Sequence, residues 1–249
     1  MTYCLALRLD EGLIFLADTR TNAGLDNVNT FRKLHVLAPA PDRVFVLQSA
    51  GSLATTHEVL DRIDRDLATA GEHESLATVG HLFEAALYVG RLNREVAAEH
   101  RETVGPDSAA TFILGGQISG GRADILLVYP EGNYIRVSDE RPFLQIGESK
   151  YGKFMLELAV EKHVDLSKAT KIALGSMMST ARANLSVGPP YDLAILRTEG
   201  GVVMQEFRVT EDSPLLTKLR DVWERHMMLA VAELPPITAG DFEAVVSTD

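Results

Sequence analysis

The pattern of apolar residues at the start of the chain predicts paired β-strands. The runs Thr2 to Leu9 and Leu13 to Asp18 flank residues 10–12, a short loop whose glycine, Gly12, suits a left-handed backbone conformation. Both faces of each run are largely apolar, so we expect the hairpin to lie in a sheet that is covered on both sides.

Further along, strand-like and helical segments occur in groups. After a second hairpin, with strands near 34–37 and 44–47, apolar residues recur at helical spacing. The predicted order is helices at 53–67 and 76–100, strands at 110–114, 125–129 and 134–137, helices at 151–158 and 174–185, strands at 193–196 and 202–207, and a helix at 214–233.

This grouping favours an α+β fold over alternating βαβ units. Strands that are apolar on both faces predict two stacked antiparallel sheets between helical layers, an α-β-β-α sandwich. We assign residues 1–234 to a single domain and residues 235–249 to a C-terminal tail.

Composition narrows the function classes. A net charge of −11 argues against non-specific binding to nucleic acid or to an anionic membrane. No apolar run reaches the ~18 residues that a membrane span needs, and a single cysteine excludes an intrachain disulfide. The histidines show no His-x-x-x-His spacing, so we predict no metal and no cofactor. The expected location is the cytoplasm.

The first hairpin brings a charged residue towards the N-terminus. If Leu9 pairs with Leu13, Thr2 lies opposite Arg20 and Asp18 becomes a diagonal neighbour of Thr2, roughly 7 to 8 Å away. A charged residue that ends an apolar run needs a partner, and Lys33 at the start of the next hairpin is a candidate.

Four elements carry a family resemblance. Thr2, Asp18-Thr19-Arg20-Thr21, Lys33 and Ser49-Ala50-Gly51-Ser52 resemble the threonine, Asp-Ser-Arg-x-Thr, lysine and Ala-Gly elements of proteasome β-subunits and of the HslV-type bacterial peptidase. The sequence of these motifs most resembles that of the Anbu (ancestral β-subunit-like) branch, and the resemblance includes residues 21–24, 146–152 and 184–190. The resemblance covers nearly the whole chain and implies the N-terminal nucleophile hydrolase fold.

The resemblance also implies a mechanism. Once Met1 is removed, the hydroxyl of Thr2 is the nucleophile and the α-amine of the same residue is the general base. Lys33, held by Asp18, stabilises the neutral amine and the developing alkoxide. The N–H of Gly51, just before a helix, is the expected oxyanion donor.

Other positions follow from the resemblance. Ser149, Asn184 and Ser186 are further members of the implied catalytic group, although this chain has Gly147-Glu148-Ser149 where proteasomes have Gly-Ser-Gly, and Asn184 where they have aspartate. The implied substrate-binding residues are Arg20, Thr21, Ser49, Leu53 and His57.

Three functions remain open at this stage. The leading hypothesis is a threonine peptidase that cleaves peptides or unfolded proteins and assembles into a ring or lock-washer-like homo-oligomer. The second is a ring-forming scaffold with little hydrolysis, and the third is an amidase for a small molecule. By family analogy, ATP-grasp and transglutaminase-like proteins are possible partners.

Overall fold

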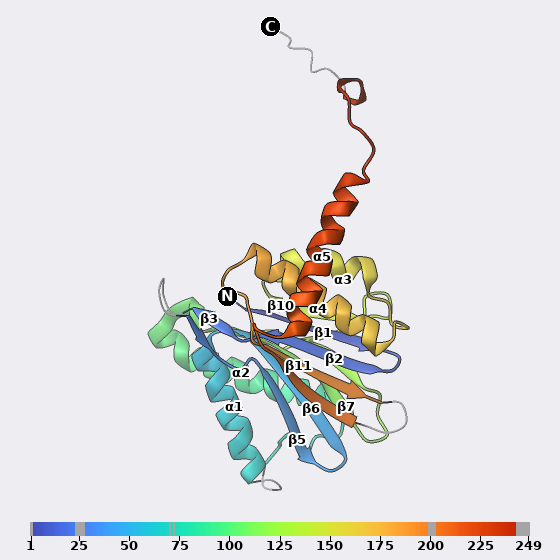
Figure 1. The fold of residues 1–249 in the computed structure, drawn as a ribbon. Coiled ribbons are helices and arrows are strands. Elements are labelled where there is room, and N and C mark those ends of the chain that lie inside the picture. Colours follow the sequence, from blue (N-terminus) through green and yellow to red (C-terminus); the bar gives the residue numbers. More distant parts are fainter. Residues whose placement is uncertain (1, 23–27, 70, 72, 199–202, 243–249) are drawn as a thin grey trace. The chain divides into compact units, whose positions relative to one another are not determined.

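The computed structural model describes residues 2–22, 28–69, 71, 73–198 and 203–242 (Figure 1). The chain forms two compact units, one up to Glu211 and one from Asp212 onwards. The predicted division between a domain and a tail at residue 234 stays a prediction.

Two five-stranded antiparallel sheets form the centre of the first unit. One sheet has the order β10-β1-β2-β11-β12, with β10 at Phe143–Gly147, β1 at Tyr3–Leu9, β2 at Gly12–Asp18, β11 at Tyr191–Arg197 and β12 at Val203–Val209. The other has the order β5-β6-β7-β8-β9, with β5 at Leu34–Ala40, β6 at Arg43–Gly51, β7 at Ala110–Ile118, β8 at Asp124–Val128 and β9 at Tyr134–Arg136. A small ribbon pairs β3 (Arg20–Asn22) with β4 (Val28–Thr30).

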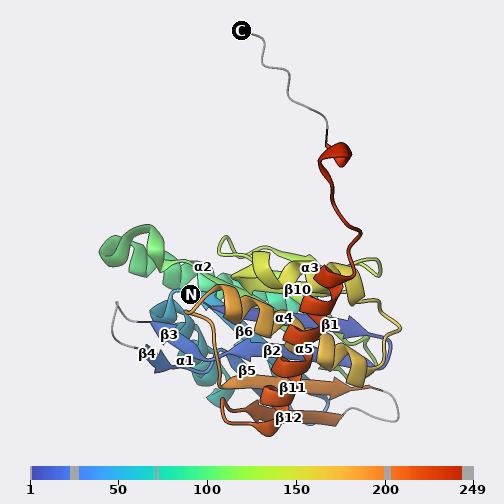
Figure 2. The same ribbon diagram turned by 45° about the horizontal axis from the view of Figure 1, so that its top comes forward.

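Helix pairs cover the outer faces of both sheets (Figure 2). Helices α1 (Leu53–Ala68) and α2 (Leu82–Val104) pack on the β5–β9 sheet, and α2 continues into a short 3-10 turn, η1 (Gly105–Ser108). Helices α3 (Ser149–Ala159) and α4 (Leu166–Ala183) pack on the other sheet. The predicted α+β sandwich with stacked antiparallel sheets is confirmed.

The two sheets pack closely because their facing side chains interlock. Phe15 of β2 is fully buried in the apolar layer between the sheets. It lies over Gly115 of β7, where an added Cβ would be 2.5 Å from the Phe15 ring. A side chain at Gly115 would therefore push the sheets apart.

The second unit consists mainly of α5 (Pro214–Ala232), followed by a 3-10 turn at Ala239–Asp241. The proline at the start of α5 suits the first helical turn, where its missing N–H costs no hydrogen bond. The predicted C-terminal helix is confirmed. None of the described helices is long and apolar enough to span a membrane.

The predicted register of the first hairpin is wrong by one residue. Leu9 pairs with Gly12, not Leu13, so the turn contains only Asp10 and Glu11. Gly12 belongs to β2, and a Cβ there would overlap the Leu196 carbonyl of β11. The glycine thus serves the neighbouring strand rather than the turn, a contact that local sequence does not reveal.

Sequence periodicity also missed the edge strand β10 and misplaced the starts of two helices. Strand β10 pairs with β1, so its partner lies far away in the sequence. Helix α2 begins at Leu82 rather than near residue 76, because a capping box ends the preceding turn: the Glu84 carboxylate accepts the N–H groups of Gly80 and His81 at 2.8 and 3.0 Å. Helix α4 begins at Leu166 rather than near residue 174, because the Asp165 carboxylate caps it by accepting the Lys168 N–H at 2.8 Å.

Candidate active site

The carboxylate of Asp18, at the end of β2, is fully buried and joins three segments of the chain. Its Oδ1 accepts hydrogen bonds from the Tyr3 amide at 2.9 Å and from the Lys33 ammonium at 2.8 Å, and its Oδ2 accepts one from the Gly188 amide at 3.4 Å. Burial raises the pKa of the Asp18 carboxyl above its ordinary value, while Lys33 and the two amides oppose that rise. The expected Asp18–Lys33 pair is therefore present.

The register correction changes how Asp18 reaches the N-terminus. Continuing the observed hairpin register places Asp18 opposite Tyr3 rather than diagonal to Thr2. The carboxylate replaces a backbone acceptor for the Tyr3 N–H. Asp18 thus fixes the residue next to Thr2.

Lys33, immediately before β5, is also buried. Besides the bond to Asp18, its ammonium donates to the Arg20 carbonyl at 2.6 Å. A lysine ammonium has three donors, so these two bonds leave one. These two hydrogen bonds hold the Lys33 ammonium close to the start of β1 and the end of β2.

The backbone of Thr2 lies against the junction of β10 and α3. The Glu148 amide donates to the Thr2 carbonyl at 2.7 Å, which extends the β1–β10 ladder by one pair. The close approach requires Gly147, which has φ +82°; a Cβ at this position would overlap the Thr2 carbonyl. Met1 lies outside the described residues.

The N–H of Gly51 points away from β7. In β6 the Ser49 amide donates to Lys33, whereas the Ser52 amide donates to Ala109 on the β7 side at 2.9 Å. Amides alternate sides along a strand, so the Gly51 N–H faces the same side as that of Ser49, beyond the first residue of β5. Among the described residues, this amide lies beyond the last β5–β6 pair, Leu34 with Gln48, a place that suits an oxygen of a ligand.

Glu148 and Asn184 form a side-chain pair beside Thr2. The Asn184 amide donates to the Glu148 carboxylate at 3.0 Å, and its oxygen accepts the Ser186 N–H at 2.9 Å. Both positions at which the chain departs from the proteasome pattern are thus in direct contact. Ser149 begins α3, and its carbonyl accepts a bond from Gln145 at 3.3 Å.

A buried polar network behind Thr2 was missed by the sequence analysis. The Tyr3 hydroxyl bonds the Ser176 hydroxyl at 2.7 Å and accepts a hydrogen bond from Gln145, and Ser176 donates to the Gly152 carbonyl at 3.0 Å. Burial raises the pKa of Tyr3 to about 12. The network links β1 to β10, α3 and α4. The only sequence feature that could have pointed to this network is the hydroxyl of Tyr3 in an otherwise apolar strand, because a buried hydroxyl needs a hydrogen-bond partner.

The expected substrate-binding residues fall into two places. Ser49, Leu53 and His57 follow one another from the end of β6 into α1, and Ser49 is buried. The His57 ring lies 5.9 Å from that of Phe31, a neighbour that the sequence analysis did not identify. Phe31 lies two residues before Lys33, and alternate residues of an extended segment share a side. This spacing was the sequence feature that could have pointed to Phe31.

Arg20 and Thr21 lie in the β3 ribbon. The Arg20 guanidinium donates to the Leu185 carbonyl at 3.0 Å and packs over Gly188, where an added Cβ would clash with it. Arg20 therefore fixes the loop after α4, and the substrate-binding role of Arg20 and Thr21 stays a prediction.

Two further expectations concern sulfur and metals. Cys4 is buried, and burial raises the pKa of its thiol, so it packs as a small apolar residue. Within the part of the chain that the structure describes, no three histidine, cysteine or acidic side chains gather in a way that could hold a metal ion.

The chain has two stacked antiparallel sheets between helix pairs, and a threonine, a buried lysine and a glycine lie at neighbouring strand ends. This arrangement defines the class of proteasome β-subunit-like proteins with the N-terminal nucleophile hydrolase fold. No protein-family model matches the chain, and no functionally curated protein matches it.

Solved structures give the family. The Anbu protein of Yersinia bercovieri is 40% identical, with a TM-score of 0.87 over 96% of this chain and 100% of that one. An Anbu of Hyphomicrobium sp. strain MC1 is 39% identical (TM-score 0.87; 95% and 99% covered), and the Pseudomonas aeruginosa Anbu complex, described as a helical assembly, is 36% identical (TM-score 0.89; 96% and 99%). The chain belongs to the Anbu (ancestral β-subunit) family.

Replacing Lys33 with alanine should lower the free energy of unfolding by about 3 to 5 kcal/mol, because the variant leaves the Asp18 charge buried without its partner. A protonated Asp18 needs no cation. Since the raised pKa makes the folded state bind a proton more tightly than the unfolded state, the deficit should shrink as the pH falls from about 7 to 5.

Urea denaturation at both pH values measures this effect. Lys162→Ala is the matched control, because that lysine pairs with Asp139 at the surface and should cost at most about 1 kcal/mol. Equal losses in the two variants would contradict the assigned burial of the Asp18–Lys33 pair.

Proposed function

We propose that this protein is a threonine peptidase of the proteasome type, which hydrolyses amide bonds through an acyl-enzyme on Thr2 after Met1 is removed. The observation that carries the proposal is the buried Asp18–Lys33 pair, which is bonded to the residue after Thr2. An ordinary ion pair gains little from burial, whereas a fixed cation beside an N-terminal hydroxyl serves catalysis.

Each step has a group to perform it. The Thr2 hydroxyl attacks the scissile carbonyl while its proton passes to the Thr2 α-amine. The carbonyl oxygen becomes an oxyanion that accepts the Gly51 N–H. The protonated α-amine then gives its proton to the leaving amine, which leaves an ester on Thr2. Water hydrolyses this ester, with the same amine as base.

Lys33 supports the first step by electrostatics. Its charge disfavours protonation of the α-amine and stabilises negative charge on the Thr2 oxygen. Asp18 and the Arg20 carbonyl hold the ammonium in place. Glu148, Asn184 and Ser186 would set the surroundings of the amine, and Ser149 lies at the same junction.

A ring-forming scaffold with the same fold is the second candidate. The specific observation in its favour is that Glu148, whose carboxylate contacts Asn184, bonds the Thr2 carbonyl through its own amide, because a carboxylate near the amine would favour the protonated form and weaken the general base. The small-molecule amidase stays a prediction, as do a cytoplasmic location and ATP-grasp or transglutaminase-like partners.

We also propose that the chain assembles with copies of itself. Tyr151, Phe154 and Leu158 lie at helical spacing on α3, and Phe154 and Leu158 are 73% and 70% exposed. Such an apolar stripe favours burial against another chain. The related Pseudomonas aeruginosa protein forms a helical assembly, so a second copy is the occupant we propose.

An epoxyketone should label Thr2, because it reacts with a hydroxyl and a free α-amine of one residue together. We expect a morpholine-type adduct on processed protein, detected by mass spectrometry of the N-terminal peptide. Thr2→Ala should lose it, and Met1-containing protein should not form it. Fully processed, folded protein without an adduct would favour the scaffold.

Leu53→Ala should change the preference for the substrate side chain. We expect kcat/KM for a leucyl peptide to fall about tenfold, with little change for an alanyl peptide, because only the larger side chain loses apolar contact. Leu87→Ala, at an exposed position of α2, is the control. A uniform decrease for both peptides would exclude Leu53 from the pocket.

Phe154→Ser should shift the protein to smaller species in sedimentation velocity at micromolar concentration, since it removes the most exposed aromatic side chain of the α3 stripe. Ile135→Ser, at another exposed apolar position, should leave the distribution unchanged. If the unaltered chain is itself a stable monomer, assembly is ruled out under these conditions.

A further inference from the structure

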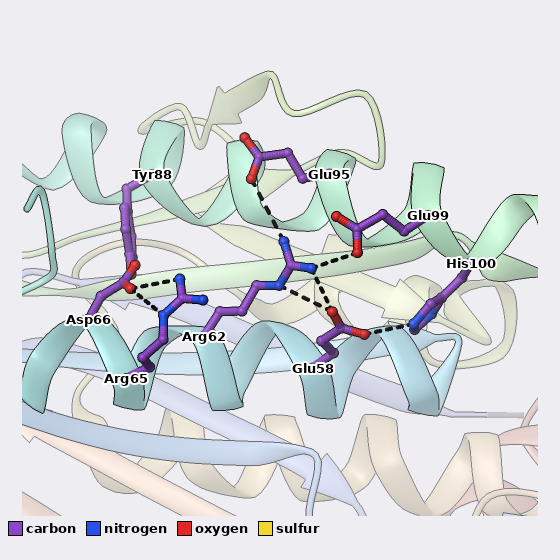
Figure 3. A network of polar contacts seen from close by, with 8 residues as sticks. All are labelled: Glu58, Arg62, Arg65, Asp66, Tyr88, Glu95, Glu99 and His100. Carbon is purple, nitrogen blue, oxygen red and sulfur yellow. Dashed lines mark hydrogen bonds and ion pairs between the residues drawn. The ribbon is translucent and has the colours of Figure 1, made fainter.

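A polar network joins α1 to α2 (Figure 3). One end of it lies near the N-terminus of α1, which follows Gly51. His100, in the last turns of α2, lies between Glu58 and Thr55 of α1. Its Nε2 is 2.7 Å from the Glu58 carboxylate, and its Nδ1 is 3.1 Å from the Thr55 hydroxyl. The sequence analysis gave His100 no role.

The partners of His100 indicate which ring nitrogens donate. The Thr55 hydroxyl donates its single proton to the Ser108 carbonyl at 2.7 Å, so it can only accept from Nδ1. The Glu58 carboxylate also accepts, so Nε2 must donate as well. Both ring nitrogens then carry hydrogens, which makes His100 an imidazolium.

Other charged side chains lie around Glu58. Arg62 of α1 donates to Glu58 at 2.6 Å and to Glu99 of α2 at 2.7 Å, and it lies 3.9 Å from Glu95. The Arg62 bond, more than His100, lowers the pKa of the Glu58 carboxyl and so keeps it an ionised acceptor. The three carboxylates outnumber Arg62, and an imidazolium reduces the remaining negative charge.

The hydrogen bond from Thr55 to Ser108 is close in the chain to Gly51, the proposed oxyanion donor. Ser108 is followed by Ala109, whose carbonyl accepts the Ser52 N–H at 2.9 Å. That carbonyl also limits Gly51, where an added Cβ would lie 2.5 Å from it. The position of η1 therefore sets the position of Gly51 and Ser52, and Thr55 connects η1 to α1.

We propose that His100, as an imidazolium bonded to Glu58 and Thr55, is a positioning residue that holds η1 against the start of α1 and so aims the Gly51 N–H. The catalytic part of this inference rests on the proposed function; the charge and the positioning do not. His100 touches no reacting atom and acts through Thr55 and the Ser108 carbonyl.

Three variants of the full chain test the proposal. In His100→Gln a neutral amide has one donor group and cannot reproduce both bonds of the imidazolium. Thr55→Val removes the hydroxyl, and Thr55→Ser keeps it. The matched control is His163→Gln, because His163 pairs with Glu161 at 2.8 Å on the surface, with its side chain 71% exposed.

Two readouts require no activity. Nitrogen-15 shifts of the His100 ring at pH 7 should show both nitrogens protonated. Hydrogen exchange of the Ser52 amide should become about tenfold faster in His100→Gln and Thr55→Val, as expected for loss of a charge-assisted hydrogen bond. Thr55→Ser and His163→Gln should stay within about twofold of the unaltered chain.

The third readout is the rate at which an epoxyketone labels Thr2. It should fall about tenfold in His100→Gln and Thr55→Val, less than the loss on removing an oxyanion donor altogether. A neutral His100 ring, or Ser52 exchange that is unchanged in His100→Gln, would overturn the proposal. If the unaltered chain forms no adduct, the hydrolase function fails, while the ring shifts and the exchange rates still decide the role of His100.

Discussion

The buried carboxylate of Asp18 is the interaction on which the rest of the site depends. A fully buried charge is tolerated only when it is paired and hydrogen-bonded, and its partners are Tyr3, Lys33 and Gly188. These partners come from the start of β1, the residue before β5 and the loop after α4. The cost of leaving the carboxylate unpaired thus brings both sheets and one helical layer to a single point, next to Thr2.

Backbone contacts complete the site around that point. Gly147 allows the Thr2 carbonyl to approach the start of α3, and Gly51 allows the end of β6 to approach Ala109. Side chains that take no part in these backbone contacts can change without disturbing them. Glu148 and Asn184 illustrate this, because the two departures from the proteasome pattern bond one another and leave the Thr2 backbone in the ladder. The fold therefore accommodates either an active hydrolase or a scaffold, and the surroundings of the amine separate them.

Local sequence determined most of the elements and the central ion pair. Apolar periodicity gave the grouped strands and helices, since alternation in strands and helical spacing are properties of neighbouring residues. A charge at the end of an apolar run required a partner, which pointed to Lys33 as the residue that bonds Asp18. The family motifs gathered Thr2, Lys33 and Gly51, which lie just before β1, just before β5 and at the end of β6.

Only the tertiary structure decided the contacts between distant segments. The hairpin register depends on Gly12 lying against β11, and β10 is a strand because it pairs with β1. Glu148 meets Asn184 across 36 residues, and His100 of α2 lies between the Glu58 and Thr55 side chains of α1. None of these contacts leaves a periodic trace, because each depends on the packing of whole layers rather than on the residues beside it in the chain.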